Sequence, residues 1–297
     1  MLELHDLCVR SAAPAGLAWL DEAKAAVAAD LRQLPLLFPQ VPRRLGRAWL
    51  SAGERRAAAG VVIECGAWRS CDAAALALLR TVFAASREDP TPLLVDLHER
   101  GDLEERTMLL RSACCLPLGP WTGKLLAAVQ RTNQVVHVAA GVLDSNQLAR
   151  TLEQGAAATV GFGQDDFERM MLKLAFIDLP LARVFDAERH ASPQLSRMLM
   201  GLATEREAAG RKVWADTNRL IAHAPAPGSL ARLLGGLESG SDEHRLAAAE
   251  GLATLGRARA ADPGLLRLVL GERLPREDSA RVRTAIAAAL EAIRAPA

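Results

Sequence analysis

The chain has 297 residues, of which half are apolar and 24% are charged, and this composition excludes a disordered chain, a collagen and a disulfide-dense scaffold. Its 36 basic and 35 acidic side chains leave a formal net charge of +1, so no cationic excess favours nucleic acid or an anionic membrane as a partner. Tyr is absent and Phe and Trp are few, whereas Ala and Leu are abundant, and this balance favours helices over strands.

The N-terminal segment carries Glu3, Asp6 and Arg10, which interrupt the apolar stretch that a secretory signal needs. Even a long uncharged run such as residues 132–143 is shorter than the roughly 18 apolar residues of a membrane span. We therefore expect a cytoplasmic protein without a membrane-spanning helix. Its five cysteines, an odd number, are typical of reduced and mostly buried thiols in such a protein, not of a disulfide framework.

Apolar residues recur at three- and four-residue spacing along most of the chain, and no alternating run indicates a strand, so the expected class is all-α. A first helix is predicted from Pro14 to about Leu34, because Pro fits the first helical turn and an apolar stripe follows it. Residues 35–48 contain three prolines and are predicted to form an ordered loop or very short helical pieces. Ser51 and Glu54 then have the spacing of a capping box at the start of the next helix.

Most of the remaining chain is also predicted to be helical, with Gly101 separating two of the helices. The expected helices cover residues 72–86, 90–100, 102–116, 121–140, 144–153, 165–176 and a further stretch that begins at Pro193. Asp165 is the expected cap of its helix, and the Gly- and Ala-rich residues 155–163 carry the weakest helical pattern.

Residues 224–228 have the sequence Ala-Pro-Ala-Pro-Gly, through which no helix continues, and they predict a subdomain boundary. Beyond it, two segments align at an offset of 38 residues, close to the length of a HEAT-type repeat. The aligned positions are Arg245, Ala248, Leu252 and Leu255 with Arg283, Ile286, Leu290 and Ile293. The predicted organisation is a helical domain over 1–224 and a HEAT-like pair of helical hairpins over 228–297 packed on it, together an α-solenoid stack of hairpins.

Motifs for catalysis and metal binding are incomplete in this sequence. Residues 119–124 resemble a phosphate-binding loop but have one residue too few between the glycines, and Leu125 replaces the hydroxyl that binds magnesium. His98 and Glu99 begin a zinc-protease pattern that lacks its second histidine. We therefore predict no catalytic residue, no cofactor and no metal site.

Charged and polar side chains give two sets of candidate binding residues. The guanidinium groups of Arg43 and Arg44 in the proline-bounded segment could hold a phosphate or carboxylate, or could simply be solvated. A second set could converge on a ligand between stacked helices, or could form ion pairs that fix helix register. This second set consists of Arg131, Asn133, Lys173, Glu205, Arg206 and Arg211.

Four strings of this chain occur in the order and approximate spacing of the EboA-domain family: VPRRLGR (41–47), RTN (131–133), MMLKLAF (170–176) and EREAAGR (205–211). On these strings, residues 15–223 resemble that family. The chain departs from the family's pattern at Thr204 and Glu207, which stand where the family has His and Trp. Ligand contacts of those two family residues are therefore not carried over.

The resemblance implies a helical cytoplasmic protein encoded beside a prenyltransferase of the UbiA type, a TatD-like hydrolase and sugar-isomerase-like proteins, in a cluster that makes or moves secondary metabolites. It implies no reaction for this component. The leading hypothesis is a non-catalytic accessory or scaffold protein that binds a partner enzyme of the same cluster or a hydrophobic intermediate. The alternatives are an enzyme or transferase acting on a small anionic or prenylated intermediate, and a protein-interaction solenoid without a ligand.

Overall fold

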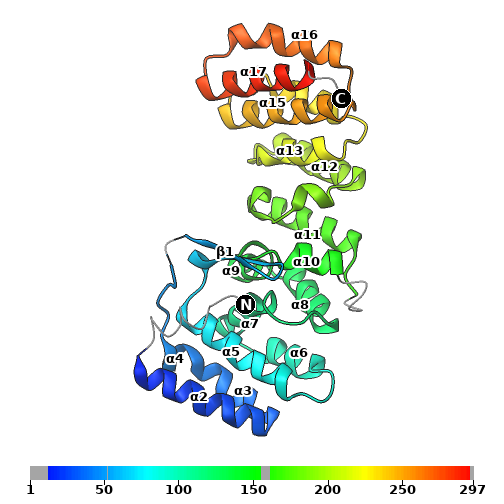
Figure 1. Ribbon diagram of the computed structural model, residues 1–297. Coiled ribbons are helices and arrows are strands. Elements are labelled where there is room, and N and C mark those ends of the chain that lie inside the picture. Colours follow the sequence, from blue (N-terminus) through cyan, green and yellow to red (C-terminus); the bar gives the residue numbers. More distant parts are fainter. Residues whose placement is uncertain (1–12, 52, 155–160, 295–297) are drawn as a thin grey trace. The chain divides into compact units, whose positions relative to one another are not determined.

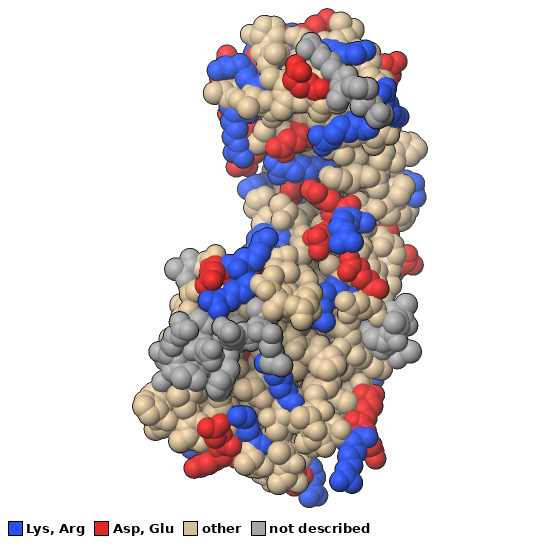
Figure 2. Space-filling model, viewed as in Figure 1, with Lys and Arg blue, Asp and Glu red and all other residues tan. Residues whose placement is uncertain are grey.

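The computed structural model describes residues 13–51, 53–154 and 161–294 and consists mainly of helices (Figure 1). It divides into two compact units, with the boundary in the chain between Phe167 and Glu168. Each unit has its own buried apolar core. On the face seen in Figure 2, Lys and Arg side chains lie among Asp and Glu side chains in both units, without a broad area of one sign.

Helices make up most of the first unit. In chain order they are α2 (Pro14–Ala29), α3 (Leu34–Leu37), α4 (Val41–Leu45), α5 (Ser70–Ala85), α6 (Thr91–Arg100), α7 (Leu103–Ala113), α8 (Pro120–Arg131), α9 (Val135–Val138) and α10 (Gln147–Gln154). Single turns of 3-10 or π-helix join some of them: η1 (Leu31–Gln33), η2 (Phe38–Gln40), η3 (Cys65–Ala67) and η4 (Ala139–Leu143). A hairpin of β1 (Arg55–Ala58) and β2 (Val61–Glu64) precedes η3. Helix α11 (Gln164–Phe176) starts in this unit and continues into the second.

The first helix begins at Pro14, as predicted, and ends earlier than predicted, at Ala29. It stops there because Asp30 has an extended backbone, and the Asp30 carboxylate accepts the N–H of Arg32 at the start of η1. The short helical pieces predicted over 35–48 are confirmed by α3 and α4, which are one turn each.

The Glu54 N–H donates to Ser51 Oγ at 3.4 Å, as one half of the predicted capping box requires, but a β-hairpin follows in place of a helix. The predicted helix start and the predicted absence of strands are therefore wrong. Ala59 (φ 52°) and Gly60 (φ 77°) both have positive φ, the backbone conformation that a tight two-residue hairpin turn requires. Residues 61–63 are all β-branched, which favours a strand once the turn has formed.

The helices predicted between residues 72 and 153 are confirmed as α5, α6, α7 and α10, except the one over 121–140. That prediction is wrong because α8 ends at Arg131 and helical structure resumes only after Gln134. Thr132 has an extended backbone, and its hydroxyl accepts the N–H of Gln134 at 3.1 Å. Such a local side-chain bond competes with helix formation.

A buried network of charges joins several elements of the first unit. The Arg111 guanidinium donates to Asp72 Oδ2 at 2.9 Å and to Asp144 Oδ2 at 3.0 Å, and all three side chains are at most 7% exposed. Arg69 also donates to Asp72, at 3.1 Å, and pairs with Glu104 at 2.5 Å. Because α5, α7 and the residue after η4 each contribute a charge, the network fixes these elements relative to one another.

The four cysteines of the described ranges are free thiols, as predicted. Cys65, Cys71 and Cys114 are buried, and Cys115 is partly exposed. Burial, together with the adjacent carboxylate of Asp72, raises the pKa of Cys71 to about 12. This thiol therefore stays protonated at neutral pH and serves as a small core residue.

The second unit continues with helices from α11 onward. Its elements are η5 (Leu181–Arg183), η6 (Ala187–His190), α12 (Pro193–Ala208), α13 (Asp216–His223), α14 (Ser229–Gly236), α15 (Asp242–Arg257), α16 (Pro263–Arg273), η7 (Leu274–Arg276) and α17 (Ala280–Arg294). The helix predicted over 165–176 is confirmed as α11, although it begins before the expected cap, Asp165. The helix predicted from Pro193 is confirmed as α12, and Ser192 caps it. Residues 155–160 lie outside the described residues, and the helical pattern weakly indicated over 155–163 does not extend to 161–163.

Helix α15 packs against both α13 and α17 in the second unit. Residues 224–228 separate α13 from α14, as predicted, and Gly228 has a φ of 94° just before α14 begins. The helices on both sides of this interruption belong to the second unit, and the division into 1–224 and 228–297 stays a prediction. The mostly helical class is confirmed with the hairpin as its exception, and HEAT-like solenoid stacking also stays a prediction.

Candidate ligand groove in the second unit

Helices α13, α15 and α17 line two neighbouring hollows, which together are called the groove. The larger hollow has a volume of about 480 Å³, and the smaller hollow has a volume of about 170 Å³. Arg219 of α13 lines both, so the hollows adjoin along the same helices. All lining residues belong to the second unit.

Lining residues recur at three- and four-residue spacing, which places them on one face of each helix. They include Asp216, Arg219 and His223 on α13, Leu246, Glu250 and Ala253 on α15, and Arg281, Ala285 and Ala288 on α17. The first residue of each set lines the smaller hollow and the last lines the larger. The three helices therefore run in the same direction along the groove.

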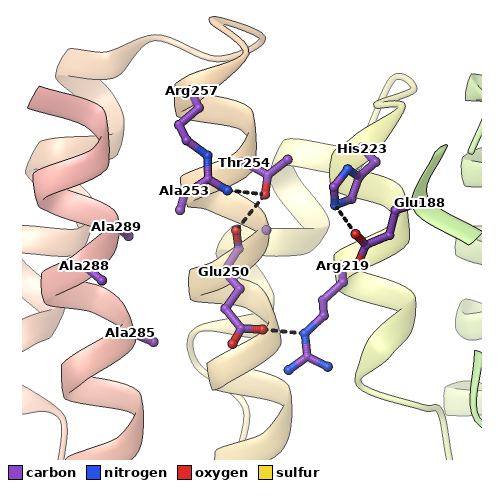
Figure 3. Close-up of a pocket in the computed structure, with 11 residues that line it drawn as sticks. Glu188, Arg219, His223, Glu250, Ala253, Thr254, Arg257, Ala285, Ala288 and Ala289 are labelled. Atoms are coloured by element: carbon purple, nitrogen blue, oxygen red, sulfur yellow. Dashed lines mark hydrogen bonds and ion pairs between the residues drawn. The ribbon is translucent and has the colours of Figure 1, made fainter. Parts of the chain in front are cut away.

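Small side chains form the apolar wall of the larger hollow (Figure 3). Ala285, Ala288 and Ala289 of α17 line it with methyl groups, which leave open a volume that larger apolar side chains would fill. Gly251 of α15 allows close packing against α13 and α14, because a Cβ at that position would lie 2.8 Å from Leu233 Cδ2 and 3.0 Å from the Asn218 carbonyl oxygen.

Charged side chains from α13, α15 and η6 lie on the other side of the larger hollow (Figure 3). Arg219 pairs with Glu250, and His223 Nε2 lies 3.4 Å from Glu188 Oε2. These four side chains are between 32% and 55% exposed. An ion pair as accessible to water as Arg219–Glu250 adds little to stability, about 0–1 kcal/mol, and His223 and Glu188 form an ion pair only when the imidazole is protonated. The four side chains therefore offer polar contacts to a ligand without being essential to the fold.

Arg257 is a further cation of the larger hollow. Its Nη2 donates to Thr254 Oγ1 at 3.2 Å, and Thr254 Oγ1 donates to the Glu250 carbonyl at 3.1 Å. Within the part of the chain that the structure describes, no carboxylate pairs with Arg257, whereas Arg219 has Glu250. An anionic group in the larger hollow would therefore find the Arg257 guanidinium available for a charge-assisted hydrogen bond.

Asp216, at the start of α13, is the buried acid of the smaller hollow. It is 6% exposed, and its Oδ2 accepts the N–H of Ala182 at 2.7 Å. Its Oδ1 is buried without a hydrogen-bond partner among the described residues, as is Nε1 of Trp214, which lines the same hollow. Burial raises the pKa of the Asp216 carboxyl, while the hydrogen bond from the Ala182 N–H and the positive charge of Arg219 act in the opposite direction.

Half of the binding residues predicted from the sequence lie in the first unit. Arg43 and Arg44 belong to α4, Arg131 ends α8, and Asn133 follows it; all four are exposed. The Arg44 guanidinium carbon lies 5.7 Å from the ring centroid of Trp19. This cation–π contact accounts for the position of Arg44 without a ligand.

The other half lie in the second unit, and none of them lines the groove. They are Lys173, Glu205, Arg206 and Arg211. Arg206 is buried and donates to the carbonyls of Lys212 at 2.7 Å and Phe176 at 3.0 Å, so it joins the end of α11 to the segment after α12. It also pairs with Asp178, which favours the structural interpretation of Arg206. A binding role for the eight residues stays a prediction.

The described residues form neither a membrane-spanning helix nor a metal-binding cluster. No helix within 13–51, 53–154 and 161–294 has both the length and the apolar character to cross a bilayer. These ranges also contain no group of three or more His, Cys, Asp and Glu side chains placed to hold a metal ion.

A family model described as "Metabolite traffic protein EboA" matches residues 2–222 of the chain. The chain belongs to the EboA family. This membership confirms the resemblance predicted from the four sequence strings. The EboA match includes Asp216 and Arg219 of the groove and ends before α14, so the groove combines family residues with helices that follow the match. No curated protein and no solved structure matches the chain.

Proposed function

We propose that this EboA-family protein is a non-catalytic accessory protein that binds a small amphipathic metabolite in the larger hollow. The observation that carries the proposal is the combination of an alanine wall with Arg257, a cation without a carboxylate partner among the described residues. The family's description as a metabolite traffic protein supports a role in holding a molecule and passing it on.

The size of the larger hollow suits a small metabolite. Its volume of about 480 Å³ lies within the roughly 300–1,000 Å³ of typical small-molecule sites. The charged residues beside it remain about one-third to one-half exposed, so a ligand can enter and leave without unfolding of a helix. This accessibility supports reversible binding.

The two sides of the hollow define the chemistry of the metabolite. Methyl groups of Ala285, Ala288 and Ala289 favour an apolar body, because burying it removes apolar surface from water. Arg257 favours one anionic group, which its guanidinium can hold by charge-assisted hydrogen bonds. A hydrophobic intermediate with a single carboxylate or phosphate group fits both sides.

The pairing of the acids supports binding without catalysis. Glu250 is held by Arg219, and Glu188 lies beside His223, so each carboxylate already faces a cationic or titratable partner. The Thr254 hydroxyl donates to a backbone carbonyl and is not activated by a base. These contacts position charges around a ligand and provide no nucleophile for it.

The proposal extends to the cellular setting that the family resemblance implies. The protein acts in the cytoplasm with a partner enzyme encoded in the same secondary-metabolite cluster, and it hands the intermediate to that enzyme or receives it. A HEAT-like stack of helical hairpins over the C-terminal part of the chain provides the surface for this exchange.

Native mass spectrometry of the protein purified gently from its own host tests the proposal. Ala288→Phe fills the larger hollow, whereas Ala287→Phe places the same ring at an exposed neighbouring position of α17 that does not line the hollow. We expect a small-molecule mass on the wild type and on Ala287→Phe, and its loss from Ala288→Phe. Arg257→Gln should weaken retention about tenfold, while Arg267→Gln, an exposed change on α16, should not.

Three outcomes contradict the proposal in different ways. Retention of the small mass by Ala288→Phe places the ligand elsewhere. A bound protein without any small mass, in every variant, favours the interaction solenoid without a ligand. Conversion of the bound metabolite by the purified protein alone favours the enzyme or transferase alternative.

A further inference from the structure

The smaller hollow contains two buried polar atoms that no described group satisfies. Asp216 Oδ1 is an acceptor without a donor, and Trp214 Nε1 is a donor without an acceptor. Both residues line the hollow. Because buried polar atoms are nearly always paired, two unpaired atoms of opposite type on one cavity indicate a group that donates and accepts at the same place.

The charges around the smaller hollow favour a neutral ligand. Arg219 and Arg281 line it together with Asp216 and Glu243, so neither sign is in excess. A carboxylate or phosphate would face the Asp216 carboxylate, and an ammonium group would face two guanidinium groups. A hydroxyl group is neutral, donates one hydrogen bond and accepts others, and therefore matches every polar group present.

The volume and the aromatic lining indicate the size of this group. The hollow measures about 170 Å³, well above the roughly 10–15 Å³ that a single water molecule needs, so it has room for one hydroxylated six-membered ring. Trp214 contributes the aromatic surface, and Lys212 Nζ lies 4.0 Å from its ring centroid and holds the indole in place. Aromatic surfaces favour ring contacts over extended polar chains.

We infer that the smaller hollow binds a neutral hydroxyl-bearing ring, the second end of the metabolite that occupies the groove. One hydroxyl of that ring donates to Asp216 Oδ1, and the ring's oxygens accept from Trp214 Nε1 and from the guanidinium of Arg281. The inference rests on the proposed function, because Arg219 joins the two hollows into one site. It adds that the ligand carries hydroxyl groups at the end opposite its anionic group.

Fluorine NMR of the full chain labelled with 5-fluorotryptophan provides a direct test. Trp214 is the one tryptophan of the sequence after Phe167, and Trp214→Phe assigns its resonance. The probes are catechol, an aromatic diol, and myo-inositol, a saturated polyol. The matched control is 1,2-dimethoxybenzene, which keeps the catechol ring and lacks its donors. We expect at least one hydroxylated probe to shift the Trp214 resonance with saturation, and the dimethyl ether to leave it unchanged.

Asp216→Asn sharpens the test with almost no change of size. The amide oxygen must accept the Ala182 N–H, so the NH₂ group takes the place of Oδ1 and presents a donor where the hollow had an acceptor. Binding of the responding probe should weaken at least about tenfold. Asp242→Asn is the control, because Asp242 pairs with Arg245 and does not line the hollow.

Absence of a Trp214 shift with both hydroxylated probes overturns the inference. So does an equal shift with 1,2-dimethoxybenzene, a result that needs only the wild-type protein and holds even if Asp216→Asn fails to fold. If the host metabolite stays bound in native mass spectrometry while both probes fail, the proposed function stands and only the hydroxyl inference falls. A catechol response identifies an aromatic diol as the source of the hydroxyls, and a myo-inositol response identifies a polyol.

Discussion

In the first unit, the buried carboxylates of Asp72 and Asp144 share the guanidinium of Arg111, whereas in the second unit the buried carboxylate of Asp216 keeps one oxygen without a partner. The exposed fractions of the three residues are similar, at 0%, 2% and 6%. Burial alone therefore does not distinguish a structural charge from a functional one. The distinguishing feature is the partner, which is another side chain in the first unit and an adjoining hollow in the second.

Burying a polar group that has a hydrogen-bond partner and burying one that lacks a partner have different energetic consequences. A buried ion pair loses much of its Coulomb gain to desolvation, but removing one member leaves the other charged and unsolvated. A buried acceptor without a partner already weakens the folded state and becomes favourable only when a ligand supplies the missing donor. The Asp72–Arg111–Asp144 network of the first unit should therefore be sensitive to mutation, whereas the Asp216 site of the second unit should tolerate mutation in the unliganded protein.

The largest effect is expected from Arg111→Met, which removes the shared donor of the first unit. Asp72 and Asp144 then lose the cation that they share, although Arg69 still donates to Asp72, and the free energy of unfolding should fall by about 3–5 kcal/mol. Urea unfolding followed by tryptophan fluorescence measures this, because four of the five tryptophans precede Phe167. Arg257→Met in the second unit is the control and should change stability by less than about 0.5 kcal/mol. Equal losses in both variants would remove the contrast between the units.

Arg206→Met tests whether a buried cation of the second unit can also be structural. Its guanidinium donates to the carbonyls of Phe176 and Lys212, so the variant leaves both acceptors without that donor. We expect a loss of about 2–3 kcal/mol, measured as the urea midpoint of helical circular dichroism. Arg211→Met, at an exposed position, should have almost no effect. Unchanged stability with reduced ligand retention would instead support the binding role predicted from the sequence.

Sequence patterns predict helices where local signals agree, and they fail where distant residues decide. Residues 102–113 have a capping box at Asp102 and Glu105, and the structure places a helix there. The hairpin of β1 and β2 has strands of four residues, too short to show alternation. It depends on Asn146, whose side chain accepts the N–H of Val62 and donates to the carbonyl of Gly60, more than 80 positions away.

The groove could not be predicted from the sequence because small residues on a helix face can play two structural roles. Alanines such as Ala285 and Ala288 permit close helix packing, which is how their pattern is ordinarily interpreted. Here they also border an open volume, whose other side is lined by polar side chains such as Arg219 and His223 that remain partly exposed. Whether an alanine permits close packing or lines a hollow depends on the side chains of the neighbouring helices. Selecting polar residues by chemical type instead identified mainly exposed residues, together with the half-buried Lys173 and one structural residue, Arg206.

Acid sensitivity should differ between the units because of His98 in the first. Burial, followed by the charges of Arg106 and His137, lowers the pKa of His98 to about 4 from 6.5. As pH falls from 6.5 to 4, the unfolded chain takes up this proton and the folded chain does not, so stability is lost across that window. His98→Leu should reduce the loss by about 2 kcal/mol, measured by urea unfolding at several pH values. Parallel pH profiles for wild type and variant would contradict this assignment.

Asp216→Asn should produce the smallest change, and one of opposite sign. Burial raises the pKa of Asp216 above its usual 3.8, so the folded state resists the negative charge that the unfolded chain carries freely, and stability falls as pH rises through this range. Removing the charge should therefore stabilise the unliganded protein slightly at pH 7, with no gain at pH 2, where the carboxyl is protonated in both the folded and the unfolded chain. The matched change in the first unit, Asp72→Asn, should instead lose about 2 kcal/mol, because Asp72 accepts from Arg111 and Arg69. Urea unfolding of both variants at pH 7 and pH 2 decides the point. A loss of stability in Asp216→Asn like that in Asp72→Asn would show that Asp216 is held by its protein neighbours and that its second oxygen does not await a ligand.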